Sequence, residues 1–536
     1  MSRPDSVIQA FDRLRQDYNA AQSTRFKRVQ TGLPALGSGA DYHYRSESQY
    51  LRIMEMIRDF ERNDPIIRAA FNRLTSNVVQ RGFTLDVDTG DEELDKRLTD
   101  EWERWSTEPD NCDISGEHDF SQMQRLAFRS MVRDGDYCLV GLQDGRLKSY
   151  EAHRLRTPRT TTRNVVLGVL QDQHRRRLEY WFTRDDIDPW RTVNRVTDMV
   201  RVPVRDAGGH RQVFHVVHPD RVSQTRGIGW CVPGVDTISM HGDIQFAKMV
   251  QQKVVSCYTV FVKRAMEWDA ADGLADAESQ PTRSDYINGL QRNLTDLFPG
   301  KVVEGLPGEE LQGFSPNVPN PEFFQHALLL LTFIAANLDL PLQVLLLDPT
   351  KTNFSGWRGA IDQARLRFQQ MQDELVKRLH KPVYEFKVRQ WLRQFGWLQD
   401  ALREGRGNVF GHKWHAPAWD YIEPYTDAQA DALVIASNLS SRRKVLAKRG
   451  LRADQIAVEA TADNAQIIDA AIEQAVALNE KHGERLQKFG LPYVDWHEIA
   501  AMPLPQGVTM SIATKPTPGE ATEPASDETD PNEAEA

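Results

Sequence analysis

The chain has 536 residues and a net charge of −10; 40% of its residues are hydrophobic and 26% are charged. The length allows several domains, and the composition is that of an ordinary soluble globular protein. The negative charge excludes a protein that coats nucleic acid through a basic surface. The cysteines show no CxxC spacing, no apolar run can span a bilayer, and charges interrupt any secretory segment, so we expect a reduced, cytosolic protein.

The N-terminal third is predicted to be mainly helical. Residues 1–45 are polar and mixed in charge, which indicates a flexible arm. Apolar residues at helical spacing predict two helices within 48–80, and Asp64-Pro65 starts the second of them. Gly82 is expected to act as a left-handed cap at the end of this helix, before a strand at 83–87.

Two further helices lead into a β-rich region. They are predicted at 91–106 and 119–134, and the turn Arg133-Asp134-Gly135-Asp136 then enters a buried strand at 137–142. Alternating apolar runs separated by turn residues predict several short strands within 146–222.

The middle of the chain contains two apolar helices. One is predicted at 235–253, followed by a β-like run at 254–262 and a polar, acidic insertion. The other begins at Asn320-Pro321 and continues almost without charge to Asn337.

A loop and a long helix come next. The loop ends near Gly356, and the helix from Trp357 is expected to end or kink at Pro382. A strand-like run at 412–419 precedes helices over 426–483. The acidic residues of 501–536 predict a disordered tail.

Catalytic motifs are absent from this sequence. It contains no Walker A loop, no GxSxG and no HExxH. His215 and His218, and likewise His412 and His415, match no metal-ligand pattern, and structural histidines in strands are favoured. We therefore expect no catalytic residues, no metal and no cofactor.

Four stretches in order resemble a tailed-bacteriophage portal protein of the lambda-like family. They are Arg62–Phe71 with Val78–Gly82, Phe120–Ser130 with Asp134-Gly135-Asp136, His215–Trp230 with its run Gln224-Thr225-Arg226-Gly227-Ile228-Gly229-Trp230, and Asn353–Ala360. The last differs from the family's Asn-Tyr-Ser-Ser-Ala type at Phe354, Gly356 and Trp357. The resemblance covers roughly residues 50 to 460, and several motifs in register are more specific than one.

The resemblance implies an α+β portal-type fold with wing, stem, clip and crown regions, built of long helices and a β-rich middle. By order along the chain the regions are 1–45 flexible arm, 46–232 wing, 233–256 stem helix, 257–319 clip, 320–339 stem helix, 340–356 tunnel loop, 357–425 long helix and wing return, 426–500 crown, and 501–536 acidic tail.

The resemblance also implies a function. It is that of a head–tail connector, a homododecameric ring at one capsid vertex through which DNA is packaged and ejected. The implied partners are double-stranded DNA without sequence specificity, the terminase large subunit, capsid and scaffold proteins, and head-completion or tail adaptor proteins, with no membrane. The implied location is the virion, and the host cytoplasm during assembly.

Two sets of residues are expected to serve this function. In the loop that faces DNA, Lys351, Thr352 and Asn353 can make weak phosphate contacts while Asp348 repels DNA, although plain solvation explains Lys351 equally well. Subunits are expected to pack through apolar side chains of the two helices around this loop, namely Phe323, Phe324, Leu328, Leu331, Ile334, Trp357, Ile361 and Phe368.

Two other interpretations stay open at this point. A nucleic-acid-processing enzyme with an unrecognised site would need clustered carboxylates for metal ions, and no diagnostic spacing is present. A non-phage helical scaffold or adaptor would not require the four ordered motifs.

Overall fold

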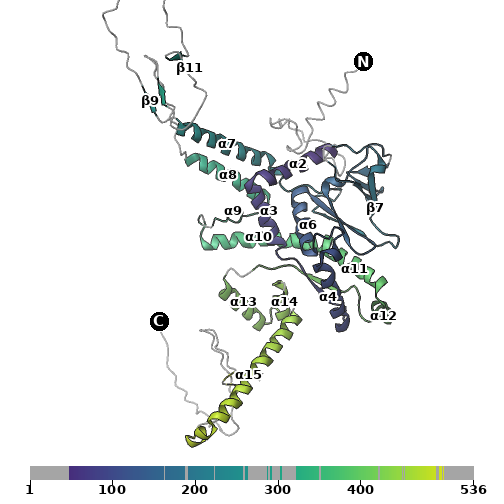
Figure 1. Ribbon diagram of the computed structural model, residues 1–536, viewed down its shortest axis with the longest axis vertical. Helices are drawn as coiled ribbons and strands as arrows, with labels where there is room; N and C mark the ends of the chain where they lie inside the picture. Colours follow the sequence, from purple (N-terminus) through teal and green to yellow (C-terminus); the bar gives the residue numbers. More distant parts are fainter. Residues whose placement is uncertain are drawn as a thin grey trace, which may run out of the picture. The chain divides into compact units, whose positions relative to one another are not determined.

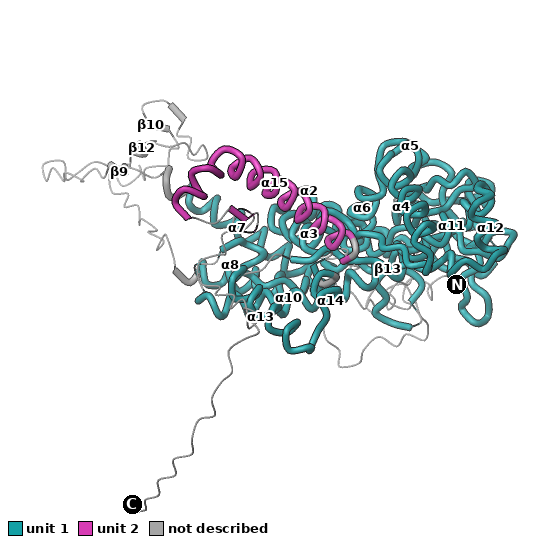
Figure 2. Tube along the Cα trace, turned by 90° about the horizontal axis from the view of Figure 1, so that it is seen from below, with its two compact units in different colours: residues 1–452 teal, residues 453–536 magenta. Residues whose placement is uncertain are grey.

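The computed structural model describes residues 47–257 and 321–490 with short gaps, and a few residues elsewhere. The gaps are 162, 188–190, 223, 349, 351, 420–422, 450 and 452, and the additional residues are 260–262, 286–287, 290–291, 302–304, 494, 495, 497 and 499. The expected arm, most of the expected clip and the acidic tail lie outside the described residues. Residues 1–452 and 453–536 form two units (Figure 2).

The first unit begins with two helices, α2 (Glu47–Asn63) and α3 (Pro65–Val78), separated only by Asp64 (Figure 1). The Asp64 carboxylate accepts hydrogen bonds from the backbone N–H groups of Ile66 at 2.8 Å and Ile67 at 3.1 Å. A side-chain cap followed by proline in the first turn starts a helix. The predicted start at Asp64-Pro65 is therefore confirmed.

Three helices follow, α4 (Glu92–Thr107), the short α5 (Pro109–Cys112) and α6 (Phe120–Asp134). Asp119 and Gln122 form a capping box at the start of α6, in which each side chain accepts from the other residue's backbone N–H. Gly135, with φ of 101°, ends the helix in a left-handed conformation. The two predicted helices of this region are confirmed.

An antiparallel sheet with the order β3-β2-β8 lies at the centre of the unit. It contains β2 (Asp136–Gly141), β3 (Leu147–Glu151) and β8 (Val213–Val217). Side chains of β2 alternate, because successive residues of a strand point to opposite faces. Tyr137 and Leu139 belong to the core shared with the helices, whereas Cys138 and Val140 belong to a core shared with a second sheet.

The second sheet has the order β4-β5-β6-β7 and is antiparallel throughout. Its strands are β4 (Val165–Val166), β5 (Val169–Gln171), β6 (Arg177–Thr183) and β7 (Met199–Pro203). The predicted β-rich region is thus confirmed. Elsewhere, β1 (Thr84–Val87) pairs with β13 (His412–His415), which joins the two ends of the unit.

The remaining short elements lie in loops or among the additional described residues. They are the 3₁₀ turns Ala152–Arg154, Val196–Asp198 and Val232–Gly234, and the strands β9 (Val260–Val262), β10 (Tyr286–Ile287), β11 (Leu290–Gln291) and β12 (Val302–Glu304).

Helices α7 (Val235–Cys257) and α8 (Pro321–Asn337) lie side by side and extend away from the sheets (Figure 1). The short α9 (Leu342–Leu346) and the long α10 (Phe354–Leu375) follow. A π-helical turn, Val376–His380, connects α10 to α11 (Lys381–Gln394), and α12 (Gly396–Glu404) comes next.

The last helices of the first unit are α13 (Pro424–Ala436) and α14 (Arg442–Lys448). The second unit contains α15 (Ala453–Lys488), and Asn479 in this helix exchanges hydrogen bonds of 2.8 and 2.9 Å with the backbone of Val494. The helices predicted over 426–483 are confirmed.

Four details differ from the sequence-based expectations. The cap of α3 is Val79, and it is followed by two residues with positive φ, Gln80 at 47° and, as predicted, Gly82 at 111°. Helix α7 runs to Cys257, because a preceding helix overrides the weak strand preference of Val254-Val255. The expected tunnel loop contains α9. At Pro382, which has no N–H to donate, the helix widens into a π turn and then resumes.

Candidate functional site

The backbones of the turn 133–136 and of the segment 225–230 approach each other closely beside the sheet β3-β2-β8. A Cβ atom added to Gly227 would overlap the carbonyl oxygen of Gly135, and one added to Gly229 would overlap the carbonyl of Arg133. Both segments therefore need glycine for close approach as well as for turning. We call this contact, residues 133–136 with 225–230, the buried junction.

Arg226 is the central side chain of the buried junction. It is 1% exposed and donates two hydrogen bonds to the carboxylate of Asp136. Nε donates to Oδ2, and Nη2 donates to Oδ1 at 2.9 Å. It also donates to the carbonyls of Ala152 at 2.8 Å and Leu167 at 3.0 Å. The guanidinium lies over the Tyr50 ring, 4.9 Å from its centroid. A buried charge needs this degree of pairing, so Arg226 joins helix, sheet and loop at one point.

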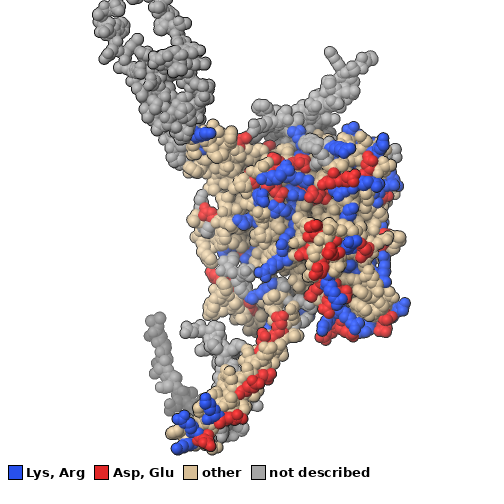
Figure 3. Space-filling view, in the orientation of Figure 1, with Lys and Arg blue, Asp and Glu red and all other residues tan. Residues whose placement is uncertain are grey.

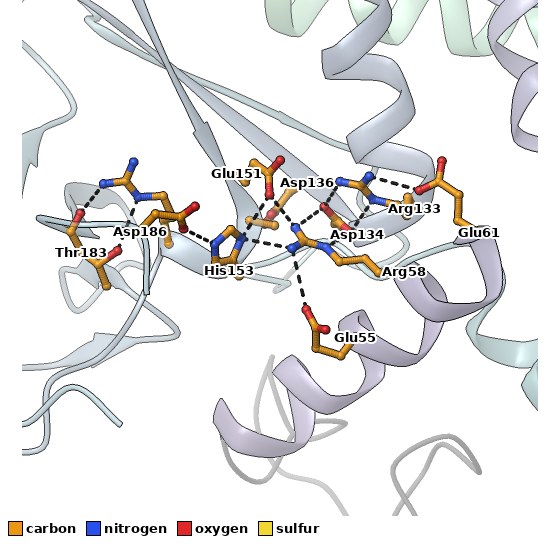
Figure 4. A network of polar contacts seen from close by, with 12 residues as sticks. Glu55, Arg58, Glu61, Arg133, Asp134, Asp136, Glu151, His153, Thr183 and Asp186 are labelled. Carbon is orange, nitrogen blue, oxygen red and sulfur yellow. Dashed lines mark hydrogen bonds and ion pairs between the residues drawn. The ribbon is translucent and has the colours of Figure 1, made fainter. Parts of the chain in front are cut away.

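A second buried aspartate lies on the other side of Gly135 (Figure 4). Asp134 receives two-nitrogen contacts from Arg58, at 2.8 and 2.9 Å, and from Arg133 at the same distances. Arg133 also pairs with Glu61 of α2 at 3.1 Å. Two ion pairs, Asp134 with Arg58 and Arg133 with Glu61, thus anchor the turn to α2. This role goes beyond the turn propensity that the sequence indicated.

Burial and charged neighbours shift the pKa values of two side chains at the buried junction. Burial alone raises the pKa of Asp136, but Arg226 and His215 outweigh it and hold the pKa well below its usual range. Burial, together with Arg177, lowers the pKa of His215 to about 4, so this histidine is neutral near pH 7. The favoured structural role of His215 agrees with its hydrogen bond to Asp136, 3.1 Å between Nε2 and Oδ2.

The four histidines that matched no metal pattern do not gather into a metal site. His218 packs edge-on against Trp230, and His412 and His415 belong to β13. Within the described ranges, no group of His, Cys, Asp or Glu side chains is arranged to hold a metal ion. Over the same residues, no helix has the length and apolar character needed to cross a membrane.

The buried junction also contacts the end of the α7–α8 pair that lies nearest the sheets. Asn337, the last residue of α8, donates to the carbonyl of Trp230 at 2.8 Å. Arg367 of α10 pairs with Asp339 at 3.0 Å and lies over the Trp230 ring, 5.6 Å from its centroid. A small cavity of about 180 Å³ remains among these side chains. The segment 225–230 therefore connects the sheets to both helices that flank the expected tunnel loop.

Farther from this end, the α7–α8 pair carries exposed apolar side chains. Figure 3 shows few charged atoms over this part of the surface, in contrast to the mixed charges over the sheets and α4. The exposed side chains and their exposed fractions are Met240 37%, Phe246 66%, Met249 60%, Val250 43%, Phe324 60%, Leu329 48% and Phe333 54%. Exposed large apolar side chains concentrated on two adjacent helices indicate an interaction site.

The predicted packing residues fall into three groups in the structure. Phe324 is exposed, while Ile334 and Phe368, each 2% exposed, are buried in the core of the single chain. The others are half-buried, namely Phe323, Leu328, Leu331, Trp357 and Ile361. Sequence reasoning missed Phe246, Met249 and Phe333, because the apolar residues surround both helices and periodicity alone did not identify the covered face.

In the expected tunnel loop, the polar side chains contact their own backbone. Asn353 caps α10 by accepting from the Gly356 N–H at 2.8 Å, and Asp348 accepts from the Thr350 N–H at 3.0 Å. Thr352 is half-buried, and Lys351 lies outside the described residues. Two of the four predicted loop residues thus have a local structural role, and their contact with DNA stays a prediction.

Comparisons with known proteins agree on one family. The family described as phage portal protein, lambda family, matches residues 35–372. The probable portal protein of Halomonas phage phiHAP-1 is 20% identical over 512 residues, which covers 90% of this chain and 91% of that protein.

Solved structures of gene transfer agent (GTA) particles are also similar. A chain in the neck of a native particle, computed with C12 symmetry, is 13% identical, with 74% of this chain and 92% of that chain covered and a TM-score of 0.39. A chain from the neck of an empty particle, computed with C6 symmetry, is 12% identical, with 74% and 93% covered and a TM-score of 0.38.

Proposed function

The chain belongs to the lambda family of phage portal proteins, and we propose that it forms a homododecameric ring at one vertex of a capsid. In this proposal the ring is the channel for DNA packaging and ejection, and it has a structural rather than a catalytic role. The terminase large subunit would dock on it during packaging. Capsid, scaffold and tail adaptor proteins would contact it in the particle, after assembly in the host cytoplasm.

The observation that carries the ring is the uncovered apolar surface of the α7–α8 pair. Phe246, Phe324 and Phe333 are each more than half exposed in the single chain. Burying such side chains against a neighbour removes apolar area from water, which drives association. A contact that joins two different surfaces of identical subunits closes into a ring when the rotation between them permits.

The regions proposed by order along the chain fit this arrangement. The wing is assigned to residues 46–232 with its return in 357–425, and the stem to 233–256 and 320–339. The clip is assigned to 257–319, the tunnel loop to 340–356 and the crown to 426–500. The buried junction then lies where wing and stem meet, a place that must keep its geometry while a neighbouring subunit is packed against the stem.

Passage of DNA sets a further requirement on the channel. Each phosphate that a protein neutralises adds salt-dependent affinity, which must be lost again at every translocation step. A chain with a net charge of −10, whose loop residues Asp348 and Asn353 bond to their own backbone, is suited to weak and sequence-independent contact.

The test is negative-stain electron microscopy of the purified chain, with end-on class averages. We expect rings with a central hole from the wild type and loss of rings from Leu329→Asp/Phe333→Asp, since two buried carboxylates oppose packing of the α7–α8 surface. The control is Leu402→Asp in α12, where an equally exposed leucine (53%) lies outside this surface. Rings that persist in the double variant, with normal melting temperature, would show that subunits pack elsewhere.

A further inference from the structure

A second hollow in the first unit is lined by arginines. Its volume is about 270 Å³, and it lies where the β5–β6 and β7–β8 connections meet the π turn before α11. We call it the arginine pocket; the arginines that line it are Arg175, Arg176, Arg177, Arg205, Arg211 and Arg378. No residue of the apolar α7–α8 surface or of the buried junction belongs to its lining, although Arg177 and His215 at its base contact the junction residues Thr225 and Asp136.

The turns in both connections that form the pocket are closed by aspartates. In the β5–β6 hairpin, the Asp172 carboxylate accepts from the N–H groups of His174 at 2.8 Å and Arg176 at 2.7 Å. In the connection between β7 and β8, which belong to different sheets, Asp206 accepts from the N–H of His210 at 2.8 Å. These turns hold their own arginine backbones in place, so the walls are formed before any ligand arrives.

The base of the pocket is a fixed hydrogen-bond network. Arg177 donates to the carbonyl of Thr225 at 2.9 Å and to Nδ1 of His215 at 2.6 Å. It also donates to the hydroxyl of Tyr180 at 3.1 Å. Because Asp136 accepts from Nε2 of His215, Nδ1 is the acceptor nitrogen, and the Arg177 guanidinium is held at the base rather than free to swing into solvent.

The charged side chains that line the pocket are all positive. Among the described residues, no Asp or Glu belongs to its lining. Arg378 pairs with Glu374 on its own helix, and Arg205 donates to the carbonyl of Gly209 at 2.6 Å. Like charges held close together repel one another, and this repulsion is relieved when an anion enters.

We propose that the arginine pocket binds a phosphate group. Several guanidinium groups that line one space can together donate to a tetrahedral dianion with oxygens in every direction, whereas a single carboxylate is satisfied by one guanidinium. The volume holds a phosphate with the atoms that carry it, but it cannot admit a duplex. The lining has no exposed aromatic face for a base, since Tyr180 is 2% exposed, so recognition is of the phosphate and not of a nucleobase.

The experiment is calorimetric titration of the full-length chain with inorganic phosphate, at ionic strength matched by chloride. The variant is Arg176→Ala/Arg211→Ala, because both residues line the pocket and are exposed, and exposed substitutions usually change stability little. We expect saturable binding to the wild type and about a tenfold or greater loss in the variant, as removal of charge-assisted hydrogen bonds predicts.

The matched control is Arg159→Ala/Arg195→Ala, which removes the same charge from two exposed arginines outside the pocket. It should bind phosphate like the wild type. No saturable phosphate binding by the wild type would overturn the proposal, as would equal losses in the two double variants. Melting temperatures of all three proteins verify that each is folded.

A competition arm identifies the source of the phosphate. Displacement of inorganic phosphate by short duplex or single-stranded DNA, absent in Arg176→Ala/Arg211→Ala, would assign the site to the backbone of a nucleic acid. Saturable phosphate binding that DNA does not displace would assign it to a free oxyanion. This test is independent of ring formation, so loss of rings and loss of phosphate binding are distinguishable failures.

Discussion

The buried junction and the α7–α8 pair differ in the exposure of their side chains. At the junction, Arg226 is 1% exposed and every nitrogen contact is made within the same chain. Along the α7–α8 pair, Phe246 and Phe333 are 66% and 54% exposed. The contacts of one region are complete within the described chain, and the other region leaves apolar side chains exposed.

The contrast separates folding from assembly. Substitutions at the junction should lower the free energy of unfolding of one chain. They either remove the partner of a buried charge or force an added side chain against the backbone. Substitutions on the uncovered surface should leave the single chain almost unchanged, since its side chains are already solvated.

Arg226→Met should be the most damaging single change. It leaves the Asp136 carboxylate buried beside His215 without its main partner, and breaking a buried pair in this way costs about 3–5 kcal/mol. Urea unfolding followed by circular dichroism measures the loss. Arg159→Ala, at an exposed arginine, should change stability by no more than about 0.5 kcal/mol. A small effect of Arg226→Met would mean that the junction is not the anchor described here.

Gly227→Ala comes next, because its new methyl group meets the Gly135 carbonyl and neither backbone can give way freely. Overpacking of this kind costs about 1–3 kcal/mol. Gly242→Ala on α7 is the matched control: nothing lies within 4 Å of its Cβ, so the same substitution should stabilise the helix by up to about 1 kcal/mol. Equal effects at the two glycines would contradict the difference between the regions.

Asn353→Ala is expected to have the smallest effect, a loss of about 1 kcal/mol from the uncapped first turn of α10. Asn353→Asp keeps an acceptor for the Gly356 N–H and should retain most of this stability. Thermal unfolding of both variants measures the difference. If neither variant changes the melting temperature, the Asn353 side chain is not needed for the fold. That outcome would favour its proposed role in the DNA channel.

Local structure was predictable wherever a few neighbouring residues decide it. Asp64-Pro65, the Asp119 start of α6 and the Gly135 turn all act through hydrogen bonds or backbone angles within four residues. The short strands within 146–222 followed from alternation and turn residues, but their division into two sheets did not. The π turn before Pro382 was not predictable in detail, because an α-helix, a kink and a wider turn all accommodate a missing N–H.

The site was predictable as a set of motifs but not as an arrangement. Sequence similarity to one family placed Asp136 and Arg226 in two separate stretches, 90 residues apart, without indicating that they meet. It also assigned Ile334 and Phe368 to subunit packing, although both are buried within one chain. For helices with apolar residues around their whole circumference, pattern alone cannot tell the core face from the free face.

The sequence by itself thus determined the helix starts, the strands, the order of the family motifs and the absence of a recognised catalytic motif. Each of these depends on short-range geometry or on residue type, which a linear pattern contains. The tertiary structure decided which charges are buried in pairs, which apolar side chains stay uncovered, and which arginines share a pocket. These depend on contacts between distant segments. The same residue contributes little to the free energy of folding when it is exposed and several kcal/mol when those contacts bury it, by about the magnitudes known for buried charges.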